Sequence, residues 1–165
     1  AMPGTSSSNT RWRNRRVMGS LRRPHPFDMA YDYETQVLDM ALPQGSVFDV
    51  LVRTEMSCRL RAVVMANKSV ETYIFEGCTS SNDGASLEIV ARRRLGIHAS
   101  ASRIFAAPTL IATGTQMHRS VLLNGERNLG EWTLAPGQTY LFRLAHSIDA
   151  GNVIVGMSLE FSEPA

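Results

Sequence analysis

Hydrophobic and polar side chains alternate with a period of two along most of the chain after Phe27. This period predicts β-strands, because successive side chains of a strand point to opposite faces of a sheet. The alternation is clearest over residues 70–75, where Val70, Thr72 and Ile74 share one face. We expect that face to belong to the core of the protein.

A break in the alternation follows and contains the sequence Asn-Asp-Gly at 82–84. These residue types tolerate positive φ, and Asn and Asp also bond to their own backbone, so the sequence predicts a turn. The alternation restarts over 87–91. We therefore expect 70–91 to form two antiparallel strands joined by a loop, a hairpin around which the rest of the chain is organised.

The same alternation, bounded by turn residues, predicts seven further strands, at 33–40, 46–53, 59–66, 103–111, 116–123, 139–144 and 153–161. Pro108 interrupts one of them and marks an edge or a bulge, because proline cannot donate a ladder hydrogen bond. Eight or nine strands at this spacing are typical of a sandwich or barrel. We expect an all-β fold, an antiparallel β-sandwich. The eight-stranded jelly roll is the favoured topology, and an immunoglobulin-like topology is the alternative.

The positive charge is concentrated at the beginning of the chain. The net charge of the whole chain is +2, but six arginines and no acidic residue precede Phe27. The remaining eleven basic residues face all fifteen acidic ones, so the rest of the chain has a net charge of −4. Residues 1–26 are also rich in Ser, Gly and Pro, a composition that does not predict a core of its own. We expect a basic extended arm at 1–26 and a β-sandwich domain at 27–165.

The arm is either a tail without contacts or a tether that orders against a partner. Trp12 and the pair Val17-Met18 favour the tether, because aromatic, Met and Arg residues are enriched at interfaces. In the domain, the run at 92–94 is either a solvated strand end or a contact for an acidic neighbour. The candidate partner-binding residues are therefore Arg11, Trp12, Arg13, Arg15, Arg16, Arg22, Arg23, Arg92, Arg93 and Arg94.

Residues that could form a catalytic or metal-binding site do not cluster in the sequence. The four histidines are isolated, whereas a cupin-type metal site needs grouped histidines and a carboxylate. No nucleophile elbow or glycine-rich phosphate loop occurs. We therefore predict no catalytic residue, no metal, no cofactor and no enzymatic activity. Aromatic residues do not alternate with the arginines of 92–94, which disfavours nucleic acid as a partner.

Apolar runs and cysteine content indicate the cellular compartment in which the protein is made. The longest apolar runs are far shorter than the ~20 residues of a membrane-spanning helix, so we expect no membrane association. Cys58 and Cys78 are too few for a disulfide scaffold, and the N-terminus lacks the apolar core of a secretory signal. We interpret both cysteines as reduced thiols of a product made in the cytoplasm.

Three segments carry a resemblance to a known family. Residues 74–84 read I-F-E-G-C-T-S-S-N-D-G and are followed over 87–94 by a strand that runs into an arginine-rich segment. Residues 131–144 read E-W-T-L-A-P-G-Q-T-Y-L-F-R-L, and residues 157–161 read M-S-L-E-F. In order and spacing these segments resemble the jelly-roll capsid decoration, or cement, proteins of tailed bacteriophages, over roughly 27–161.

The resemblance implies a virion structural protein that binds the outer surface of the bacteriophage head shell and stabilises it. It implies synthesis in the host cytoplasm and two partners, the major capsid protein and further copies of the chain, with a trimer favoured over a dimer. A tail, baseplate or fibre protein with the same sandwich is one alternative. A lectin-like ligand-binding module or a cupin-like enzyme is another.

A homo-oligomer needs a face for self-association. Four apolar residues point away from the predicted core, and we interpret them either as that face or as the second face of a two-sided core. They are Val63, Tyr73, Phe75 and Leu141.

Overall fold

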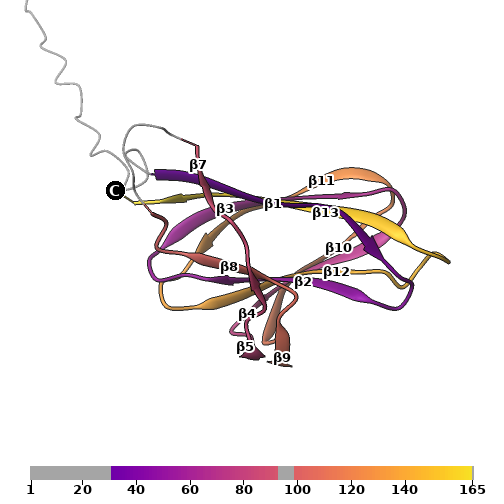
Figure 1. Cartoon of the computed structure of the whole chain (residues 1–165), viewed down its shortest axis with the longest axis horizontal. Coiled ribbons are helices and arrows are strands. Elements are labelled where there is room, and N and C mark those ends of the chain that lie inside the picture. Colours follow the sequence, from indigo (N-terminus) through magenta and orange to yellow (C-terminus); the bar gives the residue numbers. More distant parts are fainter. Residues whose placement is uncertain (1–30, 93–98, 165) are drawn as a thin grey trace, which may run out of the picture.

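The computed structural model describes residues 31–92 and 99–164 and shows two β-sheets packed face to face (Figure 1). All strand pairs among these residues are antiparallel, and the described residues form no helix. The predicted all-β, antiparallel sandwich is therefore confirmed. The predicted arm lies outside the described residues.

The first sheet has the strand order β11-β3-β13-β1-β7. Its strands are β11 (Gly125–Leu134), β3 (Cys58–Ala66), β13 (Val153–Glu163), β1 (Tyr31–Leu42) and β7 (Val90–Ala91). The second sheet has the order β10-β4-β12-β2-β8-β6. Its strands are β10 (Thr115–Leu122), β4 (Val70–Glu76), β12 (Thr139–Ala145), β2 (Val47–Arg53), β8 (Arg103–Ala106) and β6 (Ala85–Ser86).

A separate two-stranded ribbon projects from the second sheet (Figure 1). It consists of β5 (Thr79–Asn82) and β9 (Thr109–Ala112). Eight long strands remain, four in each sheet. Every connection between consecutive long strands crosses from one sheet to the other, except the connection from β4 to β10, which contains the ribbon.

The prediction of a hairpin at 70–91 is wrong. Its first strand exists as β4, but β4 pairs with β10 and β12 rather than with the segment that follows it. That segment instead crosses the edge of the sandwich, where β6 pairs with β8 and β7 pairs with β1. Leu87 and Ile89 alternate because they pack against the edge of the core between the sheets. Alternation shows that a face is buried, but it does not identify the partner strand.

The alternating apolar positions fill the space between the two sheets. The core-facing residues of the second sheet include Val50, Ile74, Phe142 and Leu144, all at most 1% exposed. Their counterparts in the first sheet include Leu60, Val64, Val155 and Leu159, which are equally buried. At ~25 cal/mol per Å² of apolar area removed from water, this layer is the main favourable term in folding.

The second sheet is apolar on its outer face as well. Leu51, Cys78 and Leu141 form a small second core there, with Phe75, Phe105 and Leu110 packed against it. Leu110 lies on β9 and Cys78 directly precedes β5, so the ribbon and the residue that leads into it cover this part of the face. Leu141 is fully buried and Phe75 is half-buried. At Leu141 the two-sided core is therefore the correct interpretation, and Phe75 packs against that second core.

Candidate interaction surface

Of the ten predicted partner-binding residues, only Arg92 lies among the described residues. It follows β7, and its side chain is 49% exposed. Its Nη1 lies 3.4 Å from Oε2 of Glu160, and its Nε lies 3.7 Å from Oε2 of Glu34. These acceptors belong to the outer face of the first sheet, so Arg92 ties the end of β7 to that face. The other nine residues lie outside the described part of the chain.

A different surface stands out in the structure. Eight large apolar side chains are exposed among the described residues, and only Val90 and Ile111 lie away from one end of the sandwich. The other six belong to turns and adjoining parts of strands at that end, which is opposite the start of β1 and the end of β13. Figure 1 shows this end of the two sheets. The six side chains are Leu38, Met40, Val47, Leu123, Ile148 and Ile154.

We call this surface the loop end. It comprises the six apolar side chains and the four turns at 43–46, 67–69, 123–124 and 146–152. The strand register brings its parts together, since Ala41 lies opposite Ile154 and Val47 lies opposite Ala145. Ile148 and Leu123 are 51% and 72% exposed, respectively. Exposed apolar side chains concentrated at one end of a molecule are a candidate interaction site, whereas single scattered ones need no explanation.

Hydrogen bonds between turns hold the loop end in one arrangement. The backbone N–H of Asn67 donates to the carbonyl oxygen of Ile154 over 3.1 Å, and the N–H of Ile154 donates to Oδ1 of Asn67 over 2.8 Å. The N–H of Ser69 donates to Oδ2 of Asp149 over 2.9 Å, and Nζ of Lys68 donates to the carbonyl oxygen of Ala150 over 3.3 Å. The turn at 67–69 is thereby fixed to the β12–β13 connection.

A buried histidine fixes the turn between β1 and β2. The side chain of His146 is inaccessible to solvent, and its Nδ1 lies 2.9 Å from the carbonyl oxygen of Leu42. The N–H of Gly45 donates to the carbonyl oxygen of His146, and the N–H of His146 donates to that of Ser46. A surface ordered in advance loses less conformational entropy when a partner binds.

A hollow of about 550 Å³ adjoins the loop end on the outer face of the first sheet. It lies beside a bulge in β1 between Val37 and Met40, where Asp39 takes a positive φ of 55°. Gly156 forms part of its floor, and a Cβ there would lie 3.3 Å from Cδ2 of Leu38 and from Cε of Met65. The side chains of Leu38 and Met65 lie close to the glycine, which gives the hollow an apolar floor.

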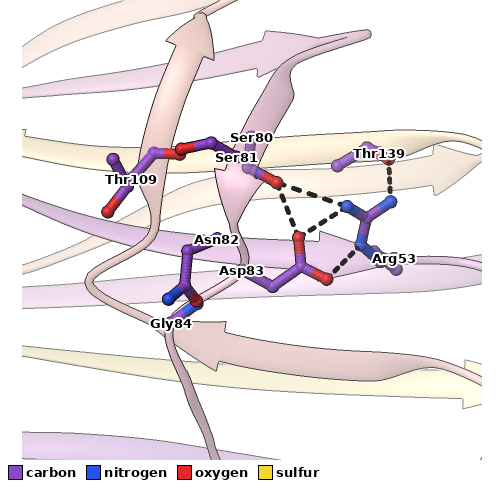
Figure 2. Close-up of polar contacts among 8 residues, drawn as sticks. All are labelled: Arg53, Ser80, Ser81, Asn82, Asp83, Gly84, Thr109 and Thr139. Atoms are coloured by element: carbon purple, nitrogen blue, oxygen red, sulfur yellow. Dashed lines mark hydrogen bonds and ion pairs between the residues drawn. The ribbon is translucent and has the colours of Figure 1, made fainter.

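A network of charged and polar groups positions the ribbon on the second sheet (Figure 2). Nε and Nη2 of Arg53 donate to the two carboxylate oxygens of Asp83, over 2.8 and 2.6 Å. The hydroxyl of Ser80 donates to Oδ1 of Asp83 over 2.6 Å, and Nη1 of Arg53 lies 3.4 Å from Oγ1 of Thr139. Asp83, within the turn predicted at 82–84, thus anchors the ribbon to the end of β2.

Asp83→Asn is expected to destabilise the fold in a pH-dependent way. Hydrogen bonds from Arg53 and then Ser80 lower the pKa of Asp83. A lowered folded-state pKa contributes stability that is present above the unfolded pKa of ~3.9 and is lost as the pH falls through the folded pKa. Urea unfolding at pH 7 should show a loss of about 1 kcal/mol, a modest value because a third of each side chain is exposed. Near pH 3 the difference between variant and wild type should shrink. An equal difference at both pH values would contradict this account.

The two cysteines are buried free thiols in the structure. Burial, followed by the charge of Glu163, raises the pKa of Cys58 to about 12. Burial also raises the pKa of Cys78. Because the thiolate is the nucleophile and metal ligand, both thiols are in their unreactive protonated form at neutral pH.

Within 31–92 and 99–164, no group of three His, Cys, Asp or Glu side chains is placed to hold a metal ion. The same residues include no helix long and apolar enough to cross a membrane. His118 lies edge-on to Trp132, with ring centroids 5.7 Å apart, and its Nε2 is 3.2 Å from the hydroxyl of Ser120.

The loop end was missed at the sequence level, although a signal for it exists. Leu123 precedes the turn Asn124-Gly125, and Ile148 lies within the turn at 146–152. A large apolar residue inside a turn has no strand neighbour to bury it, and several such turns indicate a contact surface. Comparison of the chain with protein-family models, with curated proteins and with solved structures found no match.

Proposed function

We propose that this chain is a capsid decoration protein that binds the outer surface of a tailed-bacteriophage head and stabilises the shell. The observation that carries the proposal is the loop end, which has six of the eight exposed large apolar side chains of the described residues, two on turns and four on the adjoining parts of strands. Hydrogen bonds join its turns to one another. Such a surface suits docking against another protein. The sequence resemblance supplies the identity of that protein, the major capsid protein.

We infer that the sandwich is a jelly roll. The support is the order of the eight long strands, β1-β13-β3-β11 in one sheet and β2-β12-β4-β10 in the other. All connections between consecutive long strands cross from one sheet to the other except the one from β4 to β10, an arrangement that matches two Greek keys. Jelly rolls are common in viral capsid domains, so this inference and the sequence resemblance favour the same class of protein.

The segments that carry the resemblance are part of the framework of the fold. In 131–144, Tyr140 is 1% exposed; its hydroxyl accepts a hydrogen bond from the N–H of Ala135 over 2.8 Å and lies 3.2 Å from Oε1 of Glu76. Trp132 packs against the main core and donates its indole N–H to the carbonyl oxygen of Leu129. A resemblance in such positions supports a shared structural role rather than a shared reaction.

Because a head shell repeats the same binding site many times, each decoration protein needs only a binding surface of modest size. The head presents the same site many times, and an oligomer of decoration proteins would engage several sites at once. Multivalency then gives strong attachment from individually weak contacts. We propose a homo-oligomer, with a trimer favoured, that assembles on the outside of the head after synthesis in the host cytoplasm.

Ile148→Asp is expected to weaken binding to expanded, undecorated heads roughly tenfold or more. Burying an Ile side chain in an interface is worth ~1.5–3 kcal/mol, and a buried unpaired carboxylate adds a further cost. The stability of the free protein should hardly change, because Ile148 is 51% exposed. Co-sedimentation of the full chain with heads over a concentration series measures the apparent Kd.

Ile111→Asp is the matched control, because Ile111 is 72% exposed but lies on the ribbon, away from the loop end. This variant should bind as the wild type does. Binding by both variants at wild-type affinity would exclude the loop end as the contact. No binding by the wild-type protein, with its fold intact by circular dichroism, would overturn the proposed function itself.

A further inference from the structure

The hollow beside the loop end carries an acidic group on each side of its apolar floor. Glu126 lies on β11 and Asp39 on β1, and both are exposed. The strands between them contribute Met65 of β3 and Gly156 of β13, which are register neighbours. Three strand spacings of ~4.8 Å place the backbones of the two acidic residues about 14 Å apart. Neither carboxylate forms an ion pair with any residue in 31–92 or 99–164.

The arm contains a segment of complementary composition. Residues 15–23 read R-R-V-M-G-S-L-R-R, in which an arginine pair flanks an apolar stretch on each side. In an extended chain the six-residue step from Arg16 to Arg22 covers about 20 Å, which matches the separation of the two acids once side-chain reach is included. Arginine is suited to such contacts, because its planar guanidinium pairs with carboxylates in two parallel hydrogen bonds. Val17, Met18 and Leu21 would then lie over the apolar floor.

The arm is long enough to reach the hollow of its own chain. The nine-residue step from Arg22 to Tyr31 spans at most about 30 Å when extended. The eight-residue step along β1 from Tyr31 to Asp39 covers about 27 Å. Pro24 and Pro26 favour an extended path over this distance. A tethered segment binds at a high effective concentration, so contacts too weak for a free peptide suffice.

We propose that residues 15–23 of the arm dock in this hollow of the same chain, with arginines paired to Asp39 and Glu126. The docked arm would cover part of the apolar surface beside the loop end in the free protein. This proposal concerns the free protein and does not depend on the proposed function, because its test requires no phage heads.

Limited trypsin digestion of the full chain tests the docking. Trypsin cuts after arginine, so the arm carries its own cleavage sites. Mass spectrometry measures the rates of cleavage after Arg16 and Arg22. The rate of cleavage after Arg11, which lies outside the docking segment, is the internal reference. The test variant combines Asp39→Asn and Glu126→Gln. Asparagine tolerates the positive φ at position 39, so the bulge should persist. Loss of two exposed ion pairs should raise the relative cleavage rate at Arg16 and Arg22 roughly fivefold.

The matched control combines Glu55→Gln and Glu88→Gln, two exposed acidic residues that do not line the hollow. It changes the net charge by the same amount, and its cleavage pattern should equal that of the wild type. Equal cleavage of the wild type and the test variant would overturn the proposal. So would protection of the wild type that disappears on hundredfold dilution, because the arm would then be held by a second copy. Protection that is independent of concentration and lost only in the test variant is the predicted result.

Discussion

Gly84→Ala is expected to destabilise the sandwich by about 3 kcal/mol or more, enough to leave a substantial unfolded fraction in a protein of ordinary stability. Gly84 has a φ of +93°, and a Cβ there would lie 2.1 Å from the carbonyl oxygen of Ala106. The obstacle is backbone rather than a flexible side chain. That backbone is itself held, since the N–H of Ala107 donates to the carbonyl oxygen of Asp49 over 2.9 Å. The substitution therefore forces the ribbon away from β8.

The measurement is urea unfolding of Gly84→Ala beside Gly137→Ala. Gly137 also has a positive φ, of 71°, but a Cβ there would meet no atom within 4 Å. The control therefore carries only the cost of the left-handed backbone, about 1 kcal/mol. The difference between the two variants isolates the steric contact at Gly84. Equal losses in both would show that the ribbon does not pack against the second sheet as described.

Asp49→Ala is expected to cost about 3–5 kcal/mol, because it leaves a mostly buried guanidinium without its partner. The side chain of Asp49 is 8% exposed and that of Arg143 is 22% exposed. Their two hydrogen bonds, 2.7 and 2.8 Å long, join β2 to β12 at directly opposed positions. The hydrogen bonds that Arg143 donates to Asp49 raise the pKa of Arg143 in the wild type. In the variant these bonds are gone, but a guanidinium keeps its proton at any pH at which the protein is folded, so Arg143 cannot avoid the penalty by becoming neutral.

A double-mutant cycle separates the pair from its surroundings. Asp49→Ala combined with Arg143→Met should recover most of the stability lost in Asp49→Ala alone, since no buried charge then remains. Methionine retains an apolar side chain to pack against Phe75, over whose ring the guanidinium now lies at 5.8 Å. Unfolding of the four proteins in urea measures the coupling. Additive losses would contradict a direct interaction between the two side chains.

The sequence pattern predicted the strands that face the core and failed at one strand of the first sheet. β11 was not predicted, because its residues are mostly polar and exposed at the edge of the sheet. A bulge between Asn128 and Glu131, with Gly130 at a φ of +95°, also interrupts its alternation. Trp132 and Leu134, beyond the bulge, contact the core. A period of two is lost wherever one residue is inserted into a strand.

Local turn signals located turns correctly but not the strands that they join. Asn124-Gly125 does lie at a turn, yet β10 and β11 belong to different sheets. At 82–84 the N–H of Gly84 donates to Oδ1 of Asn82, but the chain runs on from β5 into β6 and does not turn back along β4. Turn chemistry depends on a few neighbouring residues, whereas pairing depends on apolar faces distant in the sequence. The interruption predicted at Pro108 is confirmed, because strand β8 ends before this residue and strand β9 begins after it.

The candidate surface was less predictable than the fold. The arginines could be named as contact candidates from the sequence because they are concentrated in two segments, at 11–23 and 92–94. The loop end depends on six apolar residues that are scattered between positions 38 and 154 and become neighbours only through the strand order. The hollow likewise depends on a bulge in β1 and on Gly156 of β13, whose nearest neighbours come from β1 and β3. Such surfaces emerge from topology, which the alternating pattern does not specify.

The central claim is that the loop end attaches this protein to the outside of a phage head. Electron cryomicroscopy of expanded heads saturated with the full chain tests it most directly. The predicted result is a sandwich at symmetry-related positions on the outer surface, with Ile148 and Leu123 buried against the shell or a sister subunit. Heads without added density, or a sandwich attached by its ribbon with the loop end facing solvent, would contradict the account.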